Sequence, residues 1–318
     1  MKTIIILGST GSIGRQTLDV IRASKNKFKV VGLSANTNKS LLEKQAKEFG
    51  AKWITTENPA ELASKKCDIV VNAISGLAGL EPTLAALKVG NKIALANKES
   101  IVASGEKIMR LAMSGQIVPV DSEHSSIYQC LVGRDINTVD KIILTCSGGP
   151  FLGKKKSELK NASASQALAH PTWSMGKKIS VDSATLMNKG FEVIEAHHLF
   201  GIPYEKIEVL IHPQSIVHGM VVFKDGSIVA HASMPDMKIP IAYALGANVS
   251  FSKLDLAGKN LNFLQPDHET FEGIKIALKY KNRGKKLVEA NDEAVHKFLA
   301  GEIEFLDIYK EIKKSLAR

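Results

Sequence analysis

The stretch Gly8-Ser9-Thr10-Gly11-Ser12-Ile13-Gly14 decides the fold class of this chain. It follows residues 3–7, a short apolar run that predicts a β-strand, and it precedes residues 12–23, which have helical periodicity. Glycines between a strand and a helix let a pyrophosphate approach the free N–H groups at the helix start. This order therefore predicts the first βα unit of a dinucleotide-binding domain.

The alternation of strands and helices continues to residue 121. Strands alternating with helices favour a parallel sheet covered on both faces, whose functional edge is formed by the carboxyl ends of its strands. The predicted strands are 28–33, 52–55, 68–74, 92–96 and 117–120, and the predicted helices are 39–49, 77–89 and 100–113.

The pattern changes from about residue 122. Asp225-Gly226 is a hairpin signal between two predicted strands, so an antiparallel component is expected. We predict an α/β fold: a Rossmann-like parallel-sheet domain (1–121), an α+β catalytic and dimerisation domain (122–247), a linker (248–269) and a small, shortened C-terminal helical domain (270–318). The strands expected here are 139–145, 206–211, 216–223 and 227–234; residues 154–166 are expected to form a surface loop, and 181–200, 271–281, 285–299 and 306–316 are expected to be helices.

Composition narrows the functional classes. The 318 residues are 44% hydrophobic, and their apolar runs are far shorter than the ~20 residues of a membrane helix. The net charge is +10, but aromatic content is 6% and no nucleic-acid-binding motif is present. Three cysteines without a C-x-x-C pair are typical of a reducing compartment. We expect a cytoplasmic protein that binds small molecules, and no nucleic acid or membrane.

The end of the second predicted strand indicates which dinucleotide is used. An acid normally stands there when NAD is bound, because it accepts a hydrogen bond from the ribose 2′-hydroxyl. Here the sequence is Ser34-Ala35-Asn36-Thr37-Asn38-Lys39, without an acid, which favours NADP(H). Arg15, just after the third glycine, either adds charge for the 2′-phosphate or is an exposed helix residue.

Two groups of acids predict a metal site. Asp121-Ser122-Glu123 follows the last predicted strand, and Asn188, Glu192 and Glu195 share one face of a predicted helix. Oxygen ligands without cysteine suit Mg²⁺ or Mn²⁺. The two acids near 121 lie in one site if the strand continues; alternatively Ser122 caps a helix with Glu123 in its first turn.

Further polar residues are candidates for binding a phosphorylated substrate. Lys98 follows a predicted strand at the same sheet edge, where it either faces a substrate oxygen or is a solvated lysine. Ser147-Gly148-Gly149 after a strand offers N–H groups and a hydroxyl to an anion. Ser183, Asn188 and Lys189 complete such a pocket or serve as a cap and surface residues, and the lone histidines His170 and His212 are structural or catalytic.

Several longer motifs carry a family resemblance. They resemble the 1-deoxy-D-xylulose 5-phosphate reductoisomerase family over most of the chain, up to about residue 300. The motifs are the glycine turn at 8–14, Ala-Asn-Lys-Glu-Ser at 96–100, Pro-Val-Asp-Ser-Glu-His at 119–124, Ser-Gly-Gly-Pro-Phe at 147–151, His-Pro-Thr-Trp-Ser-Met-Gly at 170–176, Lys-Ile-Ser-Val-Asp-Ser-Ala-Thr at 178–185, Met-Asn-Lys-Gly at 187–190 and Ile-His-Pro-Gln-Ser at 211–215.

The resemblance implies specific residue roles. It implies catalytic roles for Lys98, Glu123, Glu192 and His170, and a flexible lid over residues 169–176. The implied metal ligands are Asp121, Glu123 and Glu192. The implied substrate-binding set is Lys98, Ser122, Glu123, Ser147, His170, Trp173, Ser183, Asn188, Lys189, Glu192, Glu195 and His212. The implied cofactor-binding set is Gly8, Thr10, Gly11, Ser12, Ile13, Asn36, Asn38, Ala73, Asn97, Glu99 and Met175.

The resemblance also implies the chemistry. A homodimer with NADPH and Mg²⁺ or Mn²⁺ rearranges 1-deoxy-D-xylulose 5-phosphate to a branched aldehyde and reduces it to 2-C-methyl-D-erythritol 4-phosphate. This chain departs from the family pattern at Thr37, where relatives often have a basic residue, and its C-terminal helical region is expected to be shorter than theirs. The alternatives are an NADP-dependent dehydrogenase of another phosphorylated aldehyde and a non-catalytic NADPH-binding regulator.

Overall fold

The structure is a computed structural model that describes residues 1–173 and 175–317. These residues form two compact units. The first unit contains Met1–Tyr128 and Asp236–Ser252, and the second contains Gln129–Pro235 and Lys253–Arg318. The chain therefore crosses from one unit to the other three times.

A six-stranded parallel sheet is the centre of the first unit. Its strand order is β3-β2-β1-β4-β5-β6, so the order reverses between β1 and β4, where the glycine turn follows β1. Ligands of open parallel sheets bind outside the carboxyl ends of the strands at this reversal. The strands are β1 (Lys2–Leu7), β2 (Phe28–Ser34), β3 (Trp53–Thr55), β4 (Ile69–Asn72), β5 (Lys92–Leu95) and β6 (Ile117–Pro119).

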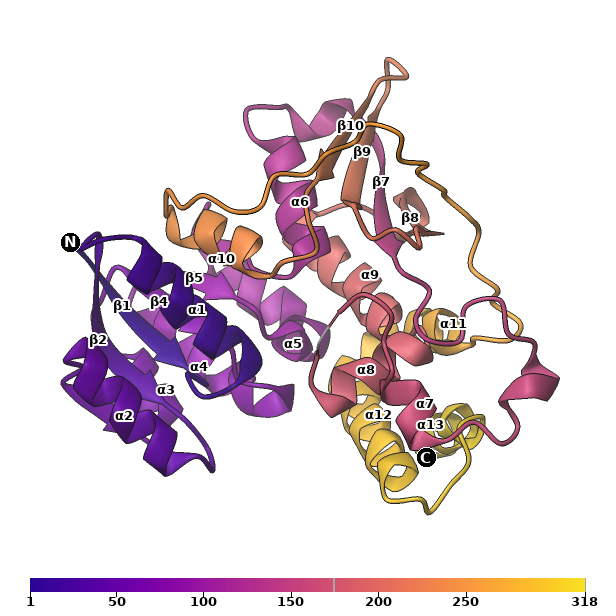
Figure 1. Cartoon of the computed structure of the whole chain (residues 1–318), viewed down its shortest axis with the longest axis horizontal. Helices are drawn as coiled ribbons and strands as arrows, with labels where there is room; N and C mark the ends of the chain where they lie inside the picture. The colour runs from indigo at the N-terminus through magenta and orange to yellow at the C-terminus, as the bar shows by residue number, and fades with distance from the viewer. Residues whose placement is uncertain (174, 318) are drawn as a thin grey trace. The chain divides into compact units, whose positions relative to one another are not determined.

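Helices cover both faces of this sheet because its strands are apolar on both sides. Ile4 and Ile6 of β1 join an apolar cluster with α1, α2 and α10, whereas Ile5 and Leu7 point the other way and are also fully buried. Figure 1 shows α1 and α2 beside β1 and β2. The helices are α1 (Ser12–Ala23), α2 (Lys39–Phe49), α3 (Pro59–Ala63), α4 (Leu80–Lys88) after the 3₁₀ turn η1 (Gly76–Gly79), α5 (Lys98–Leu111), α6 (Ser122–Leu131), which continues into the second unit, and α10 (Lys238–Leu245).

The second unit is built on a four-stranded mixed sheet in the order β10-β9-β7-β8. Strand β7 pairs parallel with β8 and antiparallel with β9, and the predicted hairpin joins β9 to β10. Helix α9 contacts β7 and β8. The strands are β7 (Val139–Cys146), β8 (Ile207–Ile211), β9 (Val217–Phe223) and β10 (Ile228–Ala232).

Helices from two distant parts of the sequence pack together in this unit. Helices α8 and α9 contact the C-terminal helices α12 and α11, respectively, and Figure 1 shows these C-terminal helices in yellow and orange beside α8 and α9. The helices are α7 (Ala164–Leu168), α8 (Lys177–Ala184), α9 (Met187–Phe200), α11 (Gly273–Lys279), α12 (Gly284–Leu299) and α13 (Asp307–Leu316), with 3₁₀ turns at Ile136–Thr138, Lys156–Leu159, Tyr204–Lys206 and Lys281–Arg283.

The predicted fold class is confirmed, but one predicted element is wrong. Residues 181–200 do not form a single helix, because the chain turns between α8 and α9. Leu186 adopts a left-handed backbone conformation (φ +57°), and the hydroxyl of Thr185 hydrogen-bonds the carbonyls of Val181 and Asp182. Nothing in the local apolar periodicity reveals such a turn, since tertiary packing holds it.

Other predictions need correction at the element level. Residues 154–166 include a 3₁₀ turn and the start of α7, so they are not simply a loop, and α10 was not predicted. The first compact unit includes residues 236–252, which the sequence-based division placed in the second domain and the linker. None of the helices in the described part of the chain has the length and apolar content needed to cross a membrane.

Gly273, the first residue of α11, allows the closest backbone approach at the α8–α9 turn. A Cβ at this position would lie 2.4 Å from the amide nitrogen of Met187 and 2.4 Å from the carbonyl oxygen of Thr185. We expect Gly273→Ala to destabilise the chain by about 2 kcal/mol, because backbone must move to admit the methyl group. Chemical denaturation measures this loss.

Gly176→Ala is the control for this prediction. Gly176 is exposed, has an ordinary negative φ of −65° and has open space around it, so alanine should change the unfolding free energy by no more than about 0.5 kcal/mol. Equal unfolding free energies for Gly273→Ala and wild type would contradict the prediction.

Candidate active site

The glycine turn has the geometry of a pyrophosphate cradle. Gly8 has a positive φ of +78°, and a Cβ at Gly14 would lie 2.3 Å from the carbonyl oxygen of Gly8. No side chain caps the first turn of α1, which leaves its N–H groups to a ligand. Thr10, Gly11, Ser12 and Ile13 form this turn and the helix start. The residues present therefore fit a dinucleotide.

Neighbouring segments fix the turn in place. Gln45 of α2 is buried and accepts a hydrogen bond from the Ser9 hydroxyl (2.8 Å), while its amide donates to the Ser9 carbonyl (3.0 Å). The amide nitrogen of Ala73 donates to Leu7 (2.9 Å), which brings Ala73 beside Gly8. Gln45 carries no motif, so sequence reasoning missed it.

The predicted cofactor residues at other strand ends have mixed roles. Asn36 and Asn38 are exposed after β2, but the Asn38 side chain accepts from Leu41 N and so caps α2. Asn97 is buried; its side chain caps α5 and donates to the carbonyls of Ile74 (2.7 Å) and Gly76 (2.8 Å). Asn97 thereby shapes the loop after β4, and its Nδ2 also donates to Glu99 (3.2 Å).

Asp121 lies at the carboxyl edge of the sheet, next to Lys98. The Lys98 Nζ is 2.8 Å from Asp121 Oδ2, and Nδ1 of the fully buried His124 is 3.4 Å from Oδ1. Burial by itself raises the pKa of Asp121, but the charges of Lys98 and His124 outweigh burial and hold that pKa well below its ordinary value. Asp121 is therefore anionic and could serve as an oxygen ligand. His124 was quoted in a motif but was assigned no role.

Of the two alternatives for Glu123, the structure has the helix. Strand β6 ends at Pro119, α6 begins at Ser122, and Glu123 stands in its first turn with its amide donating to Asp121 Oδ1 (3.3 Å). The alternative in which the strand continues through both acids is therefore not the one observed. The Ser122 hydroxyl donates to the Glu123 carboxylate.

In the second unit, α9 carries the other predicted acids. Glu192 and Glu195 are each 1% exposed. The Asn188 amide donates to one Glu192 oxygen and the Lys189 ammonium to the other, which confirms that 188 and 192 share a face. A buried carboxylate needs such compensation, or else it takes up a proton. Carboxylate oxygens are the ligands that a hard divalent cation prefers, so these residues fit such a cation.

The loop after β7 brings together several predicted phosphate residues. A Cβ at Gly149 would lie 3.0 Å from the Ser183 carbonyl, so the Ser147 loop packs on α8. The Lys189 ammonium donates to the Thr145 carbonyl (2.6 Å) near the end of the same strand. Ser147, Ser183 and Lys189 therefore gather at one end of β7.

His170 is bonded to the same loop. Its Nδ1 accepts from the amides of Thr172 (3.1 Å) and Trp173 (3.0 Å), so Nε2 carries the proton and lies 2.9 Å from the Ser147 hydroxyl. The Ser147 oxygen also accepts from Gly149 N, which leaves its own proton to donate to an anion.

Trp173 of the predicted lid has its ring 6.0 Å from the ring of His218. Met175 is half-buried, and Ser174 of the predicted lid lies outside the described residues.

His212 is fully buried but is less available than predicted. Its Nδ1 donates to the Asn262 carbonyl (2.8 Å), and its ring stacks on Phe263 at 4.7 Å. Nδ1 therefore holds the proton, and the buried Nε2 presents a lone pair. A lone pair accepts from a hydroxyl and does not donate to an anion.

A dinucleotide cradle, lysine-paired acids and a loop with N–H groups and a hydroxyl for an anion are typical of a nucleotide-dependent oxidoreductase of phosphorylated small molecules. Three family models match the chain, described as 1-deoxy-D-xylulose 5-phosphate reductoisomerase (residues 4–65 and 56–105), its C-terminal domain (117–200) and the DXP reductoisomerase C-terminal domain (232–318). The chain belongs to the 1-deoxy-D-xylulose 5-phosphate reductoisomerase family.

Curated relatives support this assignment over nearly the whole chain. The reductoisomerase of Caldanaerobacter subterraneus subsp. tengcongensis is 47% identical, covering 99% of this chain and 92% of the relative. That of Desulfitobacterium hafniense strain Y51 is 46% identical, covering 99% and 91%. The first alignment spans 352 positions against 318 residues here, so this chain has internal gaps relative to that enzyme.

Solved structures agree in fold. The Zymomonas mobilis reductoisomerase in complex with NADPH is 38% identical with a TM-score of 0.91, covering 99% of this chain and 91% of that one. A DOX-P reductoisomerase in complex with NADPH, fosmidomycin and magnesium is 38% identical with a TM-score of 0.89, covering 99% and 89%. The predicted family and enzyme class are confirmed.

The hydrogen bonds of His170 predict its titration. Burial lowers the pKa of His170 below the ordinary 6.5, and protonating Nδ1 would break both bonds from the lid backbone. We expect NMR at pH 7.5 to show the Nε2–H tautomer and a titration midpoint below 6.5.

The lowered pKa of His170 also determines how the free energy of unfolding changes with pH. The native state binds fewer protons than the unfolded chain, so the contribution of neutral His170 is complete above the unfolded pKa. It is lost as pH falls through the native pKa. A midpoint above 6.5, or the Nδ1–H tautomer at pH 7.5, would contradict the assignment.

Proposed function

We propose that the chain catalyses the metal-dependent rearrangement and NADPH-dependent reduction of 1-deoxy-D-xylulose 5-phosphate to 2-C-methyl-D-erythritol 4-phosphate. The observation that carries this proposal is the 47% identity to a reductoisomerase over 99% of the chain. The residues support it independently, because the chain has both a dinucleotide cradle and lysine-paired acids. The reaction belongs to the non-mevalonate supply of isoprenoid precursors.

NADPH is the proposed hydride donor. Its pyrophosphate is assigned to the uncapped turn around Gly8, and its adenosine ribose to the exposed segment with Asn36 and Asn38, where no acid opposes a 2′-phosphate. Ala73, Asn97 and Glu99 are assigned to the nicotinamide half, with Met175 of the lid. Position 37 holds a threonine where relatives often have a basic residue. Arg15 and Lys39 are therefore the cations near this segment in the sequence that we assign to the 2′-phosphate.

A divalent cation, Mg²⁺ or Mn²⁺, is proposed to be held by Asp121, Glu123 and Glu192. Bound there, it supplies Lewis-acid polarisation of the substrate carbonyl. Magnesium is bound by the reductoisomerase whose structure also contains NADPH and fosmidomycin. Lys98, which neutralises Asp121 in this structure, is placed to contact a substrate oxygen once the acid has another cation.

The second unit is proposed to bind the substrate phosphate. Ser147 and Ser183 offer hydroxyls, and Asn188 and Lys189 offer an amide and a charge at the same end of β7. His170 orients Ser147 through Nε2 and anchors the lid through Nδ1, so that Trp173 covers the substrate and excludes water. Ser122, Glu195 and His212 are assigned to the hydroxyls of the substrate.

The assembly and location are also proposals. We infer a homodimer, as the family pattern implies; β10 is an edge strand of the mixed sheet with Ile228 55% exposed. We infer a cytoplasmic location, since all three cysteines are free thiols. Sedimentation velocity tests the assembly, and a monomer at micromolar concentration would refute it.

The function predicts a three-component requirement. NADPH oxidation should need both 1-deoxy-D-xylulose 5-phosphate and Mg²⁺ or Mn²⁺, because a cation held by the acids would supply the polarisation of the substrate carbonyl. A spectrophotometric assay at 340 nm with and without a chelator checks this. Turnover that survives complete chelation would eliminate the metal mechanism and favour a simple dehydrogenase.

Glu192→Gln separates metal binding from cofactor binding. It keeps the size of a buried side chain but removes its charge, so we expect turnover to fall by at least about 10³-fold, consistent with the loss of a metal ligand. NADPH should still bind with its wild-type dissociation constant, measured by nicotinamide fluorescence. Unchanged turnover would refute the assignment of Glu192.

A further inference from the structure

The α8–α9 turn joins two helices that carry proposed substrate ligands. Ser183 lies near the end of α8, and Asn188 and Lys189 lie in the first turn of α9. Between them Leu186 adopts a left-handed backbone conformation. A left-handed leucine is costly, so it persists only where surrounding contacts hold it. The orientation of Ser183, Asn188 and Lys189 therefore depends on the contacts that stabilise this turn.

Three C-terminal helices hold the turn. The first residue of α11, Gly273, abuts the backbone of Thr185 and Met187. The hydroxyl of Tyr309, on α13, donates to the Thr185 carbonyl at 3.2 Å, and Tyr309 is 2% exposed. Helix α12 supplies the third contact through Asn291. These contacts come from a segment about 100 residues further along the chain.

Asn291 is unusual within α12. It is 0% exposed, and the other buried side chains of this helix, except Gly284, are apolar: Leu287, Val288, Ala290, Ala294, Val295 and Phe298. A buried amide is stable only when it is hydrogen-bonded. Its Nδ2 donates to Asp182 Oδ1 at 2.8 Å. The amide is thus committed to one acid on α8.

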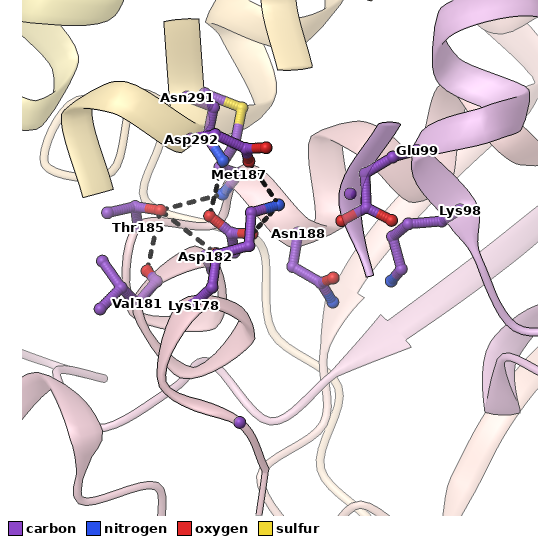
Figure 2. Close-up of polar contacts among 12 residues, drawn as sticks. Lys98, Glu99, Lys178, Val181, Asp182, Thr185, Met187, Asn188, Asn291 and Asp292 are labelled. Atoms are coloured by element: carbon purple, nitrogen blue, oxygen red, sulfur yellow. Dashed lines mark hydrogen bonds and ion pairs between the residues drawn. The ribbon is translucent and has the colours of Figure 1, made fainter. Parts of the chain in front are cut away.

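Asp182 is held from two sides. It is 2% exposed; Asn291 donates to one carboxylate oxygen, and Lys178 Nζ lies 3.1 Å from the other. Lys178 also pairs with Asp292 at 3.0 Å, the residue after Asn291. Figure 2 shows Asp182 between Lys178 and the α12 pair, with the Thr185 bonds beside it. The network closes a ring between α8 and α12.

We propose that Asn291 is a positioning residue for the substrate phosphate, acting through Asp182 on the adjacent Ser183 and on the α8–α9 turn. This inference rests on the proposed function, since it concerns the phosphate of that substrate. Asp182 and Ser183 are consecutive on one helix, so fixing the rotation of α8 by the carboxylate fixes the direction of the Ser183 hydroxyl. A small rotation of α8 misplaces the hydroxyl, and misplacement weakens binding steeply.

The test is Asn291→Ala in the holoenzyme. We expect the KM for 1-deoxy-D-xylulose 5-phosphate to rise about tenfold, since a hydrogen bond to a buried charge is lost. The inhibition constant of inorganic phosphate as a competitive inhibitor should rise in parallel. The KM for NADPH should stay within about twofold of wild type, because the glycine turn belongs to the other unit.

Two further variants keep the test decisive if Asn291→Ala fails to fold. Tyr309→Phe keeps the ring and removes the donor to Thr185, so the substrate KM should rise about threefold. The exchange Asp182→Asn with Asn291→Asp reverses donor and acceptor across the same contact. Each single variant should raise the substrate KM, and the double variant should have a KM closer to that of wild type than either of them.

Glu293→Gln is the matched control on α12. Glu293 is 61% exposed and pairs only with Lys297 among the contacts described, so both KM values should match wild type. A substrate KM within twofold of wild type in both Asn291→Ala and Tyr309→Phe would overturn the inference. A parallel rise in the KM for NADPH would also overturn it, since that indicates general loss of structure.

The same assays separate this inference from the proposed function. If the wild type oxidises NADPH with this substrate and the variants bind it normally, only the positioning role fails. If the wild type does not turn over the substrate at all, the proposed function fails and the positioning role fails with it.

Discussion

Carboxylate charge held largely away from water is the constraint on which this structure depends. Asp121 in the first unit is 13% exposed and Glu192 in the second is 1% exposed, and an apolar environment expels or protonates such acids. Each is compensated within its own unit by a lysine, Lys98 and Lys189, respectively. An acid that already faces a cation loses little when a divalent ion takes over the compensation. The lysine pairs therefore offset the charge of two acids that we propose as metal ligands.

Neutral amides hold the loops around these charges. Gln45 fixes Ser9 of the glycine turn, Asn97 fixes the loop after β4, and Asn291 fixes Asp182 beside the phosphate residues. An amide offers both donors and an acceptor, and its desolvation costs far less than that of a charge. Gln45 and Asn97 therefore tie irregular backbone at strand ends, and Asn291 ties one helix to another, without adding charge. Acids and lysines thus carry the charge, whereas neutral amides hold the structure around them.

His170 links the proposed lid to the proposed phosphate loop in the second unit. Its two nitrogens have opposite roles, because Nδ1 accepts from lid amides while Nε2 donates toward Ser147. The arrangement requires the neutral imidazole, and burial favours that form by lowering the pKa of His170. One side chain thus joins the backbone of Thr172 and Trp173 to the hydroxyl of Ser147. If these segments are the proposed lid and phosphate loop, His170 couples them.

The sequence by itself determined the parallel sheet, the glycine turn, the family motifs and most of the acids and hydroxyls proposed for the site. These features are encoded locally: alternation gives the strands, glycines give the turn, and α1 and α2 have the predicted bounds. Only the tertiary structure decided between strand and helix at Ser122, broke 181–200 at Leu186, and paired Gln45 with Ser9 and Asn291 with Asp182. The reason is that each of these depends on partners tens to a hundred residues away, such as Ser9 for Gln45 and Gly273 for Leu186. No periodicity within one segment records which distant segment will hold it.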